Sequence, residues 1–215
     1  MTYPQLWEGQ LRDGLVQMGI ALSGAQQAQL LAFLALLAKW NRAYNLTAVR
    51  DERVMVSRQL LDSLSIMPWL TTGHLLDVGA GGGMPGIPLA IVFPDKRFTL
   101  LDSNGKKTRF LNQCILELGL ANVEVIHGRA EDCRPEQPYS QISSRAFTAL
   151  GNLVGWCQQL LADSGQFLAM KGQFPDDEVA ALPVGWQVES SHPLKVPGAD
   201  GERHLLIVTR AEQTR

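Results

Sequence analysis

The stretch from His74 to Pro88 constrains the fold more than any other part of the chain. Its sequence is His-Leu-Leu-Asp-Val-Gly-Ala-Gly-Gly-Gly-Met-Pro-Gly-Ile-Pro, in which an apolar run reaches an acid and then meets five glycines within eight residues. Glycine serves where the backbone needs positive φ or approaches a ligand closely. The start of a following helix offers unpaired backbone N–H groups. The pattern predicts a strand, a turn and a helix that bind a nucleotide-type cofactor.

Composition places the chain among ordinary globular proteins. Its 215 residues are enough for one domain with a core plus an appendage, and 46% hydrophobic with 19% charged residues is typical of such folds. The net charge of −2 gives no general attraction to nucleic acid. An RNA or DNA partner would therefore need a local basic patch.

The sequence shows no sorting signal and no metal motif. Glu8, Arg12 and Asp13 interrupt any signal-peptide pattern, and no stretch approaches the roughly 18 apolar residues of a membrane span. The cysteines and histidines lack metal-ligand spacing, so we expect free thiols and no metal. An odd number of widely spaced cysteines fits a reducing compartment. These observations predict a cytoplasmic protein that does not associate with membranes.

Residues 1–70 have helical periodicity. Ser23 is the predicted N-cap of a helix, because its hydroxyl can accept a hydrogen bond from a free backbone N–H group. An apolar stripe follows it from Leu30 to Trp40, and we interpret this stripe as core packing rather than a partner-binding face. The pattern breaks over 41–46, and Asp51 opens a further helix.

From residue 74 the periodicity changes to alternating strands and helices. Such alternation predicts a mostly parallel sheet with helices on both faces. No helix separates the last two strands, so we expect them to pair antiparallel across the loop Pro193–Glu202. The chain would then comprise a helical extension over 1–70 and one compact domain over 71–215. The predicted strands are 74–78, 97–101, 123–126, 139–143, 166–170, 186–190 and 204–208, and the predicted helices are 87–93, 106–118 and 149–161.

Two kinds of cofactor compete for the glycine-rich turn. Such turns often bind NAD or FAD, and the segment 81–86 satisfies G-x-G-x-x-G, although that match alone is weak. Asp77 before the first glycine would repel a pyrophosphate, and Pro85 lacks an N–H that a phosphate would need. The chain also ends in a strand pair rather than a second nucleotide-binding half. S-adenosylmethionine (SAM), which has no phosphate, fits these residues better.

Acidic residues at the ends of the predicted strands match the groups of SAM. Asp77, with Gly79 and Gly81 just after it, suits the cationic methionine end. Asp102 lies 23 positions after Gly79, where a carboxylate can accept hydrogen bonds from both ribose hydroxyls. The alternative role for Asp102 is to cap the helix that follows. Residues 130 and 131 come after the third strand at the same sheet edge, where they could meet adenine.

Six segments carry a resemblance to a known family. They are Trp40–Arg50, Asp77–Pro88, Leu100–Ser103, Ser144–Phe147, Met170–Gly172 and Gly201–Leu205. Together they resemble the RsmG (GidB) family of bacterial ribosomal small-subunit RNA guanine-N7 methyltransferases over nearly the whole chain. The Asn-Leu-Thr and Ser-Arg-Ala-Phe segments are much more specific than the glycine loop. One departure is that Gln59 stands where the family has histidine in Arg-His-Leu-Leu-Asp-Ser.

The resemblance implies a fold, a reaction and a set of contacts. The fold would be an α/β Rossmann-like class I SAM-dependent methyltransferase, with a mostly parallel seven-stranded sheet, a C-terminal antiparallel hairpin and an N-terminal helical cap. The reaction would move a methyl group from SAM to N7 of a guanine in the 530-loop region of 16S rRNA in the 30S subunit. The positions matching the family's SAM contacts are Gly79, Met84, Ala130, Glu131 and Arg145.

The chemistry at guanine N7 explains which catalytic groups to expect. N7 carries an in-plane lone pair, so methyl transfer needs no general base, and the sequence offers no Ser-His-Asp or Cys-His arrangement. Positioning would supply the catalysis. Arg145, after the fourth strand, is expected at the boundary of cofactor and target base, while Arg129 and Arg203 are expected to hold RNA. The alternative for each arginine is a solvated surface ion pair.

Further basic residues could form a rim that attracts RNA, or could simply be solvated, as charged helix faces usually are. Tyr44 and Asn45 could line the target pocket, although Asn45 could equally cap a turn. Two other functions stay open at this point, namely a small-molecule SAM methyltransferase and an RNA-binding protein that uses SAM only structurally. A monomer is the default for one compact domain. The rim residues are Arg42, Arg50, Arg53, Arg58, Lys106, Lys107 and Arg109.

Overall fold

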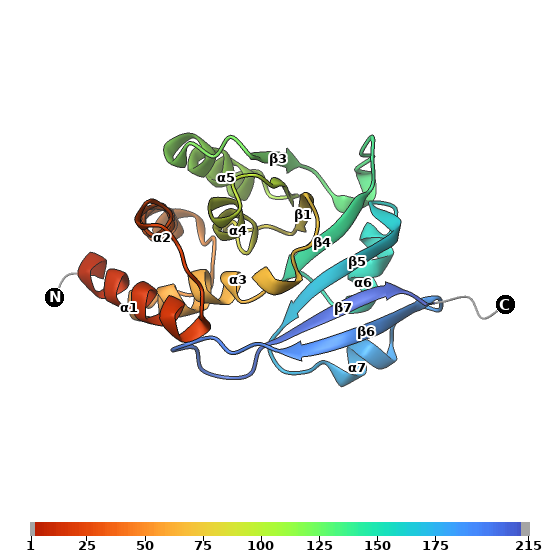
Figure 1. The fold of residues 1–215 in the computed structure, drawn as a ribbon. Helices are drawn as coiled ribbons and strands as arrows, with labels where there is room; N and C mark the ends of the chain where they lie inside the picture. The colour runs from red at the N-terminus through yellow and green to blue at the C-terminus, as the bar shows by residue number, and fades with distance from the viewer. Residues whose placement is uncertain (1–2, 212–215) are drawn as a thin grey trace.

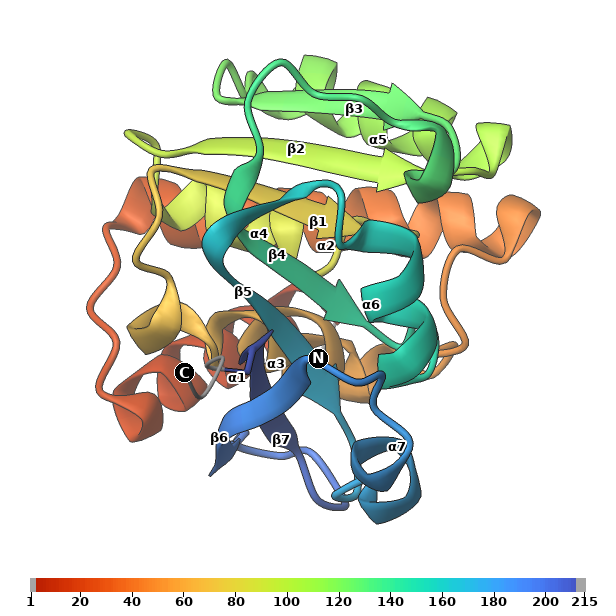
Figure 2. The ribbon, with the colours of Figure 1, turned by 90° about the vertical axis from the view of Figure 1, so that its right-hand side faces the viewer.

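The computed structural model describes residues 3–211 and is built around one seven-stranded sheet. The strand order is β3-β2-β1-β4-β5-β7-β6, and Figures 1 and 2 show the sheet from two directions. Strands β1 to β5 are parallel, while β7 is antiparallel to both β5 and β6. This confirms the predicted parallel sheet and its C-terminal antiparallel hairpin. The strands are β1 His74–Val78, β2 Arg97–Asp102, β3 Val123–His127, β4 Tyr139–Arg145, β5 Leu161–Lys171, β6 Trp186–Pro193 and β7 His204–Arg210.

Helices cover both faces of the sheet, as the alternating pattern predicts. Helices α1, α2, α4 and α5 lie on one face, and α6 and α7 lie on the other (Figure 1). Among the described residues, no helix is both long and apolar enough to span a membrane. The helices are α1 Tyr3–Met18, α2 Gly24–Tyr44, α3 Asp62–Leu64, α4 Gly86–Val92, α5 Gly105–Leu118, α6 Leu150–Cys157 and α7 Asp176–Ala180, with shorter turns η1 Glu52–Val54, η2 Val56–Leu61, η3 Met67–Trp69 and η4 Ala130–Asp132.

Alternating side chains divide the core into two halves. Along β7, Leu205 and Ile207 pack on the face that carries α1, α2, α4 and α5, whereas Leu206 and Val208 pack on the face of α6. This period of two is what a strand with both faces buried requires. The last strand in the chain therefore supplies apolar side chains to both halves of the core.

The N-terminal helices share their core with the sheet. Leu11 of α1 and Phe33 and Leu37 of α2 belong to the same buried cluster as Leu168 of β5 and Leu205 of β7. The expected boundary at residue 70 falls in the short link before β1, but the buried side chains on its two sides form one continuous cluster. The predicted stripe in α2 is thus part of the core, as expected, and Ser23 caps that helix with Gln26 in a capping box.

Several predicted boundaries were wrong. Helix α2 continues to Tyr44, past the predicted break, because the buried Asn41 side chain accepts from the Thr47 N–H and donates to the Val49 carbonyl. These hydrogen bonds let a polar residue stay inside the helix. Asn45, in the left-handed region, ends it.

Three further differences lie after residue 50. Asp51 caps a 3-10 turn rather than an α-helix, and a π-helical segment follows it over Val56–Leu61. The predicted helix 149–161 spans only Leu150–Cys157, since residue 161 already belongs to β5. Helix α7 was not predicted, because its five residues are too few to show a helical period.

A buried carboxylate ties the glycine-rich turn to the sheet. Asp77, near the end of β1, accepts hydrogen bonds from the backbone N–H of Gly86 (3.0 Å) and from the hydroxyl of Ser143 (2.9 Å). It therefore joins the first residue of α4 to the neighbouring strand β4. Burial raises the pKa of Asp77 to about 7, although both hydrogen bonds favour the ionised form and oppose that rise.

Replacing Asp77 by asparagine should remove a pH dependence of stability. The folded protein binds a proton at Asp77 more tightly than the unfolded chain, whose pKa is near 3.8, so its contribution to stability is present at low pH and is lost as pH rises toward about 7. Urea unfolding at pH 5 and pH 8 should show a larger loss of unfolding free energy for the native protein than for Asp77→Asn. Equal losses in both proteins would contradict the assignment.

Candidate active site

The glycine-rich turn adopts backbone conformations that side chains disfavour. Gly79, Gly81 and Gly83 have φ values of 65°, 56° and 88°, in the left-handed region. A Cβ at Gly79 would lie only 2.1 Å from Cδ2 of the Phe147 ring. The N–H of Gly79 also donates to the carbonyl of Leu101 on β2, which fixes the turn across the ends of two strands. These constraints explain why the sequence places glycine here.

Two cavities meet at this turn. The Asp102 cavity has a volume of about 440 Å³, and the Arg145 cavity has a volume of about 510 Å³. Both are lined by Gly79, Lys107 and Ala146, so they adjoin. The carboxyl ends of parallel strands share one edge of the sheet, and this edge is where ligands of such folds bind. The arrangement could hold two ligands whose reacting groups meet beside Gly79.

Asp102 lines the first cavity and is held by backbone donors. Its carboxylate accepts from the N–H of Gly81 (2.9 Å) and of Asn104 (2.8 Å), and Lys107 Nζ lies 4.0 Å away. The helix after it is capped by Asn104, whose side chain accepts from the N–H of Lys106 and Lys107. The capping alternative for Asp102 was therefore wrong. Each carboxylate oxygen has a second lone pair, which can accept from a ligand hydroxyl.

The far wall of the Asp102 cavity comes from two other segments. Ala130 and Glu131, on the turn after β3, line it together with the aromatic rings of Phe147 and Trp156. These rings meet edge to face, with centroids 5.8 Å apart. Arg129, predicted to hold RNA, also lines this cavity and is exposed. The residues expected around the ribose and adenine are thus brought together.

Other predicted cofactor residues have different positions. Gly79, Gly81 and Met84 line the Arg145 cavity, on the other side of the turn. Asp77 lines neither cavity and is buried behind the turn, bonded to Gly86 and Ser143. Asp77 therefore holds in place the turn that faces both cavities, without facing a cavity itself.

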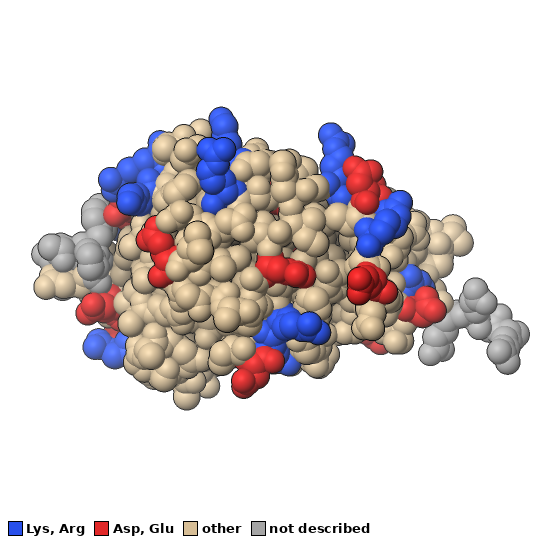
Figure 3. Space-filling model, turned by 90° about the horizontal axis from the view of Figure 1, so that it is seen from above, with Lys and Arg blue, Asp and Glu red and all other residues tan. Residues whose placement is uncertain are grey.

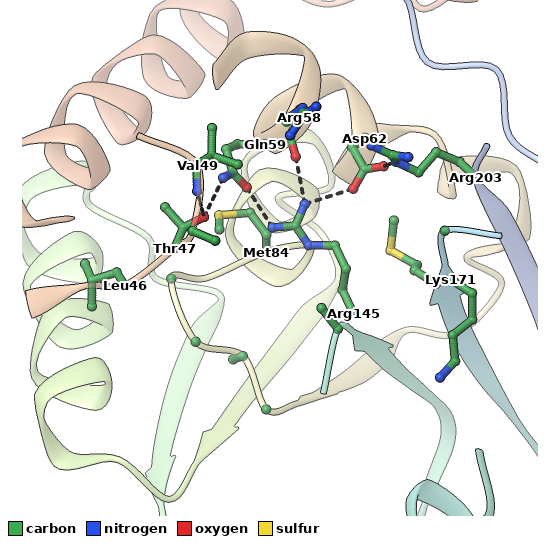
Figure 4. A pocket seen from close by; sticks show the side chains of 18 of the residues that line it. Leu46, Thr47, Val49, Arg58, Gln59, Asp62, Met84, Arg145, Lys171 and Arg203 are labelled. Carbon is green, nitrogen blue, oxygen red and sulfur yellow. Dashed lines mark hydrogen bonds and ion pairs between the residues drawn. The ribbon is translucent and has the colours of Figure 1, made fainter. Parts of the chain in front are cut away.

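Arg145 is anchored entirely by the N-terminal extension (Figure 4). Its Nη1 donates to the carbonyl of Arg58 and to Oδ2 of Asp62, both at 2.8 Å. Its Nη2 donates to Oε1 of Gln59 at 2.7 Å. Gln59, fully buried, donates in turn to the hydroxyl of Thr47. The guanidinium at the end of β4 is thus oriented by residues from another part of the chain.

Asp62 joins a second arginine to this arrangement. Arg203, immediately before β7, places Nε 3.3 Å from Asp62 Oδ1. Only 6% of the Asp62 side chain is exposed, and both arginines are largely buried. We call Gln59, Asp62, Arg145 and Arg203 the Asp62 network. Arg145 and Arg203 were predicted as site residues, whereas no role was predicted for Gln59 and Asp62.

A lysine on the neighbouring strand β5 also lines the Arg145 cavity and has its own carboxylate partner. Lys171, at the end of β5, donates to Oε2 of Glu178 (2.7 Å) and to the carbonyl of Thr148. Glu178 belongs to α7 and also accepts from the N–H of Leu150, at the start of α6. The family segment containing Lys171 was recognised in the sequence, but the helix that holds its partner was not.

Three arginines of the predicted basic rim pair with neighbouring side chains, so the rim is not a continuous basic surface. Arg42 pairs with Glu52 and Arg53 with Asp51, while Arg50 donates to the side-chain oxygen of Asn45. Seen from above, basic side chains lie mainly along one edge of the molecule, with acidic ones among them (Figure 3). Tyr44 lies outside both cavities, beside a separate open groove that is lined by Lys106 and Arg109 among others.

One of the residues that sequence reasoning missed carries a weak signal in the sequence. Asp62 is an acid within an otherwise apolar helical pattern, and a charge in such a place needs a buried partner. That signal indicates a partner without identifying it, since Arg145 and Arg203 are distant in sequence. Phe147 and Trp156 carried no signal that separates a cavity wall from a core.

Comparison with known proteins identifies the family. A family model described as GidB, rRNA small subunit methyltransferase G, matches residues 26–206. The chain belongs to this family. Ribosomal RNA small subunit methyltransferase G of Marinobacter nauticus is 82% identical over 215 residues and covers 100% of both chains. The protein of the same name from Pseudomonas aeruginosa PAO1 is 59% identical over 202 residues, which is 94% of each chain.

Solved structures confirm the class I methyltransferase fold. The glycopeptide N-methyltransferase MtfA, solved with SAM, matches with a TM-score of 0.60 at 12% identity, covering 71% of this chain and 95% of that one. The O-methyltransferase TomG from Streptomyces achromogenes, also solved with SAM, gives a TM-score of 0.52 at 15% identity, covering 84% and 90%. The SAM-dependent fold expected for this methyltransferase G family member is therefore present.

Substitution of Gly79 by alanine should impair SAM binding. The new Cβ requires a left-handed conformation that costs alanine about 1–2 kcal/mol, and it displaces Phe147 from the wall of the Asp102 cavity. Calorimetry should show weaker SAM binding and a lower unfolding free energy. Gly155→Ala is the matched control, because that glycine lies in α6 with nothing within 4 Å of a new Cβ. Unchanged SAM affinity in Gly79→Ala would contradict the placement of the cofactor.

Proposed function

We propose that this protein transfers a methyl group from SAM to N7 of a guanine in 16S rRNA of the bacterial small subunit. The observation that carries the proposal is the junction of the two cavities beside Gly79, one with Asp102 and aromatic rings and the other with arginines. Family membership supports small-subunit rRNA as the substrate. The resemblance noted in the sequence supports the N7 atom.

The Asp102 cavity fits the chemical groups of SAM. Asp102 offers free lone pairs to the ribose hydroxyls, as the backbone bonds hold its carboxylate in place. Phe147 and Trp156 provide apolar surface for adenine, beside Ala130 and Glu131. The methionine end would then lie toward the glycine-rich turn, where Gly79 permits close approach of the backbone.

The reaction itself needs positioning rather than proton transfer. SAM, when bound, supplies an electrophilic methyl group on a sulfonium. The N7 lone pair forms the new C–N bond as the C–S bond breaks, so sulfur leaves as a neutral thioether and the guanine becomes cationic. The Arg145 cavity would hold the base in line with that bond and exclude water. Arg145 is the donor best placed to contact the guanine O6 or a phosphate.

The lining of the Arg145 cavity disfavours the two alternative functions. A small-molecule methyltransferase would be expected to close an apolar pocket over its substrate, whereas Arg58, Arg145, Lys171 and Arg203 all line this cavity. Basic side chains suit a phosphate-bearing substrate. A protein that uses SAM only structurally would not require a second cavity beside the first.

We also propose that the protein acts in the cytoplasm as a monomer. The large apolar side chains that are most exposed, Val16, Leu116 and Val184, lie on separate elements rather than in one patch, so they do not suggest a stable interface. Sedimentation should give the mass of one chain, and a dimer at micromolar concentration would overturn this part of the proposal.

The deciding experiment follows labelled methyl from SAM. Small subunits that lack their native modification, naked 16S rRNA and a metabolite extract would be incubated with the protein in parallel. We expect label in 16S rRNA at a guanine that becomes sensitive to N7-specific cleavage. Label in the metabolite fraction alone would overturn the RNA substrate while keeping the cofactor.

Arg145→Ala should separate catalysis from cofactor binding. Removing the guanidinium takes away a hydrogen-bond donor of the Arg145 cavity, next in sequence to Ala146, which lines both cavities, so we expect transfer to fall by about 100-fold with a smaller change in SAM affinity. Arg129→Ala is the comparison variant. That exposed arginine lines the Asp102 cavity and not the Arg145 cavity, so its loss should change RNA affinity rather than the rate of methyl transfer. An Arg145→Ala protein that transfers methyl normally would contradict the assignment.

A further inference from the structure

Asp62 occupies an unusual position for a carboxylate. It is buried in the N-terminal extension, yet it lies between two arginines that reach the Arg145 cavity, one from the end of β4 and one from the loop immediately before β7. Oδ2 accepts from Arg145 at 2.8 Å, and Oδ1 faces Nε of Arg203 at 3.3 Å (Figure 4). A buried carboxylate without partners would be strongly destabilising, so these arginines also make its burial possible.

The two arginines that contact Asp62 are held by different sets of hydrogen bonds. Arg145 is fixed by three hydrogen bonds, two of them to Gln59 and to the carbonyl of Arg58. Arg203 meets Oδ1 as an ion pair, and no hydrogen bond to that oxygen is present among residues 3–211. Arg145 is therefore held by more hydrogen bonds to the extension than Arg203, whose Nη1 donates to the carbonyl of its neighbour Glu202.

Charge is the second reason to assign Asp62 a role. Methyl transfer to N7 leaves a cationic guanine, which two unpaired arginines would repel. The single negative charge of Asp62 offsets one of the two positive charges, and the low exposure of all three side chains makes this compensation stronger than at a surface.

We propose that Asp62, assisted by Gln59, is the positioning residue of the target site. It orients the Arg145 guanidinium, retains Arg203 beside it, and lowers the positive charge that the methylated base would meet. The role rests on the proposed function, since it concerns the arginines that would contact RNA. It assigns to the N-terminal extension a direct part in methyl transfer, through residues that do not line the Asp102 cavity.

Asp62→Asn is the main test, because it keeps the shape of the side chain and removes its charge. With SAM saturating and unmodified small subunits as substrate, we expect the single-turnover rate to fall on the order of 10- to 100-fold, with SAM affinity unchanged. RNA binding should become more dependent on salt, with a slope steeper by about one, since one more positive charge is free to contact phosphate. A purely structural role would instead weaken SAM binding and RNA binding together.

The control is Glu52→Gln, which removes the carboxylate from another arginine pair of the extension. Glu52 pairs with Arg42 at 2.9 Å, outside both cavities. It should transfer methyl at the native rate. The proposal is overturned if Asp62→Asn also transfers at the native rate, or if it loses SAM affinity along with activity.

A second pair of variants covers the case in which Asp62→Asn does not fold. Gln59→Leu removes the acceptor for Arg145 Nη2 without adding charge, so the rate should fall while RNA affinity stays constant. Gln59→Glu restores an acceptor, and the Thr47 hydroxyl can rotate to donate to it. We expect Gln59→Glu to recover most of the rate. Equal rates for the two variants would overturn the proposal.

Failure of the proposed function can be told apart from failure of this inference. If the native protein does not methylate rRNA, the function is wrong whatever Asp62 does. The ion pair itself is tested without RNA, by urea unfolding of Asp62→Asn, Arg203→Gln and the double variant. Non-additive changes in unfolding free energy support the pairing, and additive changes contradict it.

Discussion

The hydrogen bonds of the buried Asp77 carboxylate are the constraint on which the site depends. They join the end of β1 to the start of α4 and to Ser143 on β4. With both ends of the glycine-rich turn fixed in this way, its backbone can form a common wall for two cavities. The carboxylate does this from behind the turn, so a residue that lines neither cavity fixes the wall that the two cavities share.

The N-terminal extension completes the second cavity. Its helices share the core of one sheet face, and the same packing brings residues 58–62 against the end of β4. Arg145 therefore depends on two structural units, one providing its backbone and the other its orientation. The Asp102 cavity is formed by the sheet and the loops around it, whereas the Arg145 cavity requires both units.

Local patterns allowed much of the fold to be predicted. The parallel sheet, the antiparallel pairing of its last two strands and the glycine-rich turn follow from periodicities and residue types that act over a few positions. Boundaries failed where a distant contact overrides the pattern, as at Asn41, whose side-chain bonds let α2 continue. The site divides in the same way. Asp102 follows from its place at the end of a strand, but the partners of Asp62, Arg145 and Arg203, lie 83 and 141 positions away in the sequence, so no local pattern could specify them.

The position of β7 in the sheet determines when the fold can be completed during synthesis. Among the described strands β7 comes last in the sequence, yet it lies between β5 and β6 and contributes to both halves of the core. Arg203 precedes it directly. A growing chain that has not reached this strand holds a carboxylate at position 62 with only one of its two arginines, and a sheet that lacks an inner strand. In such a chain the Arg145 cavity would lack Arg203, and the core would lack the apolar side chains that β7 supplies to both of its halves.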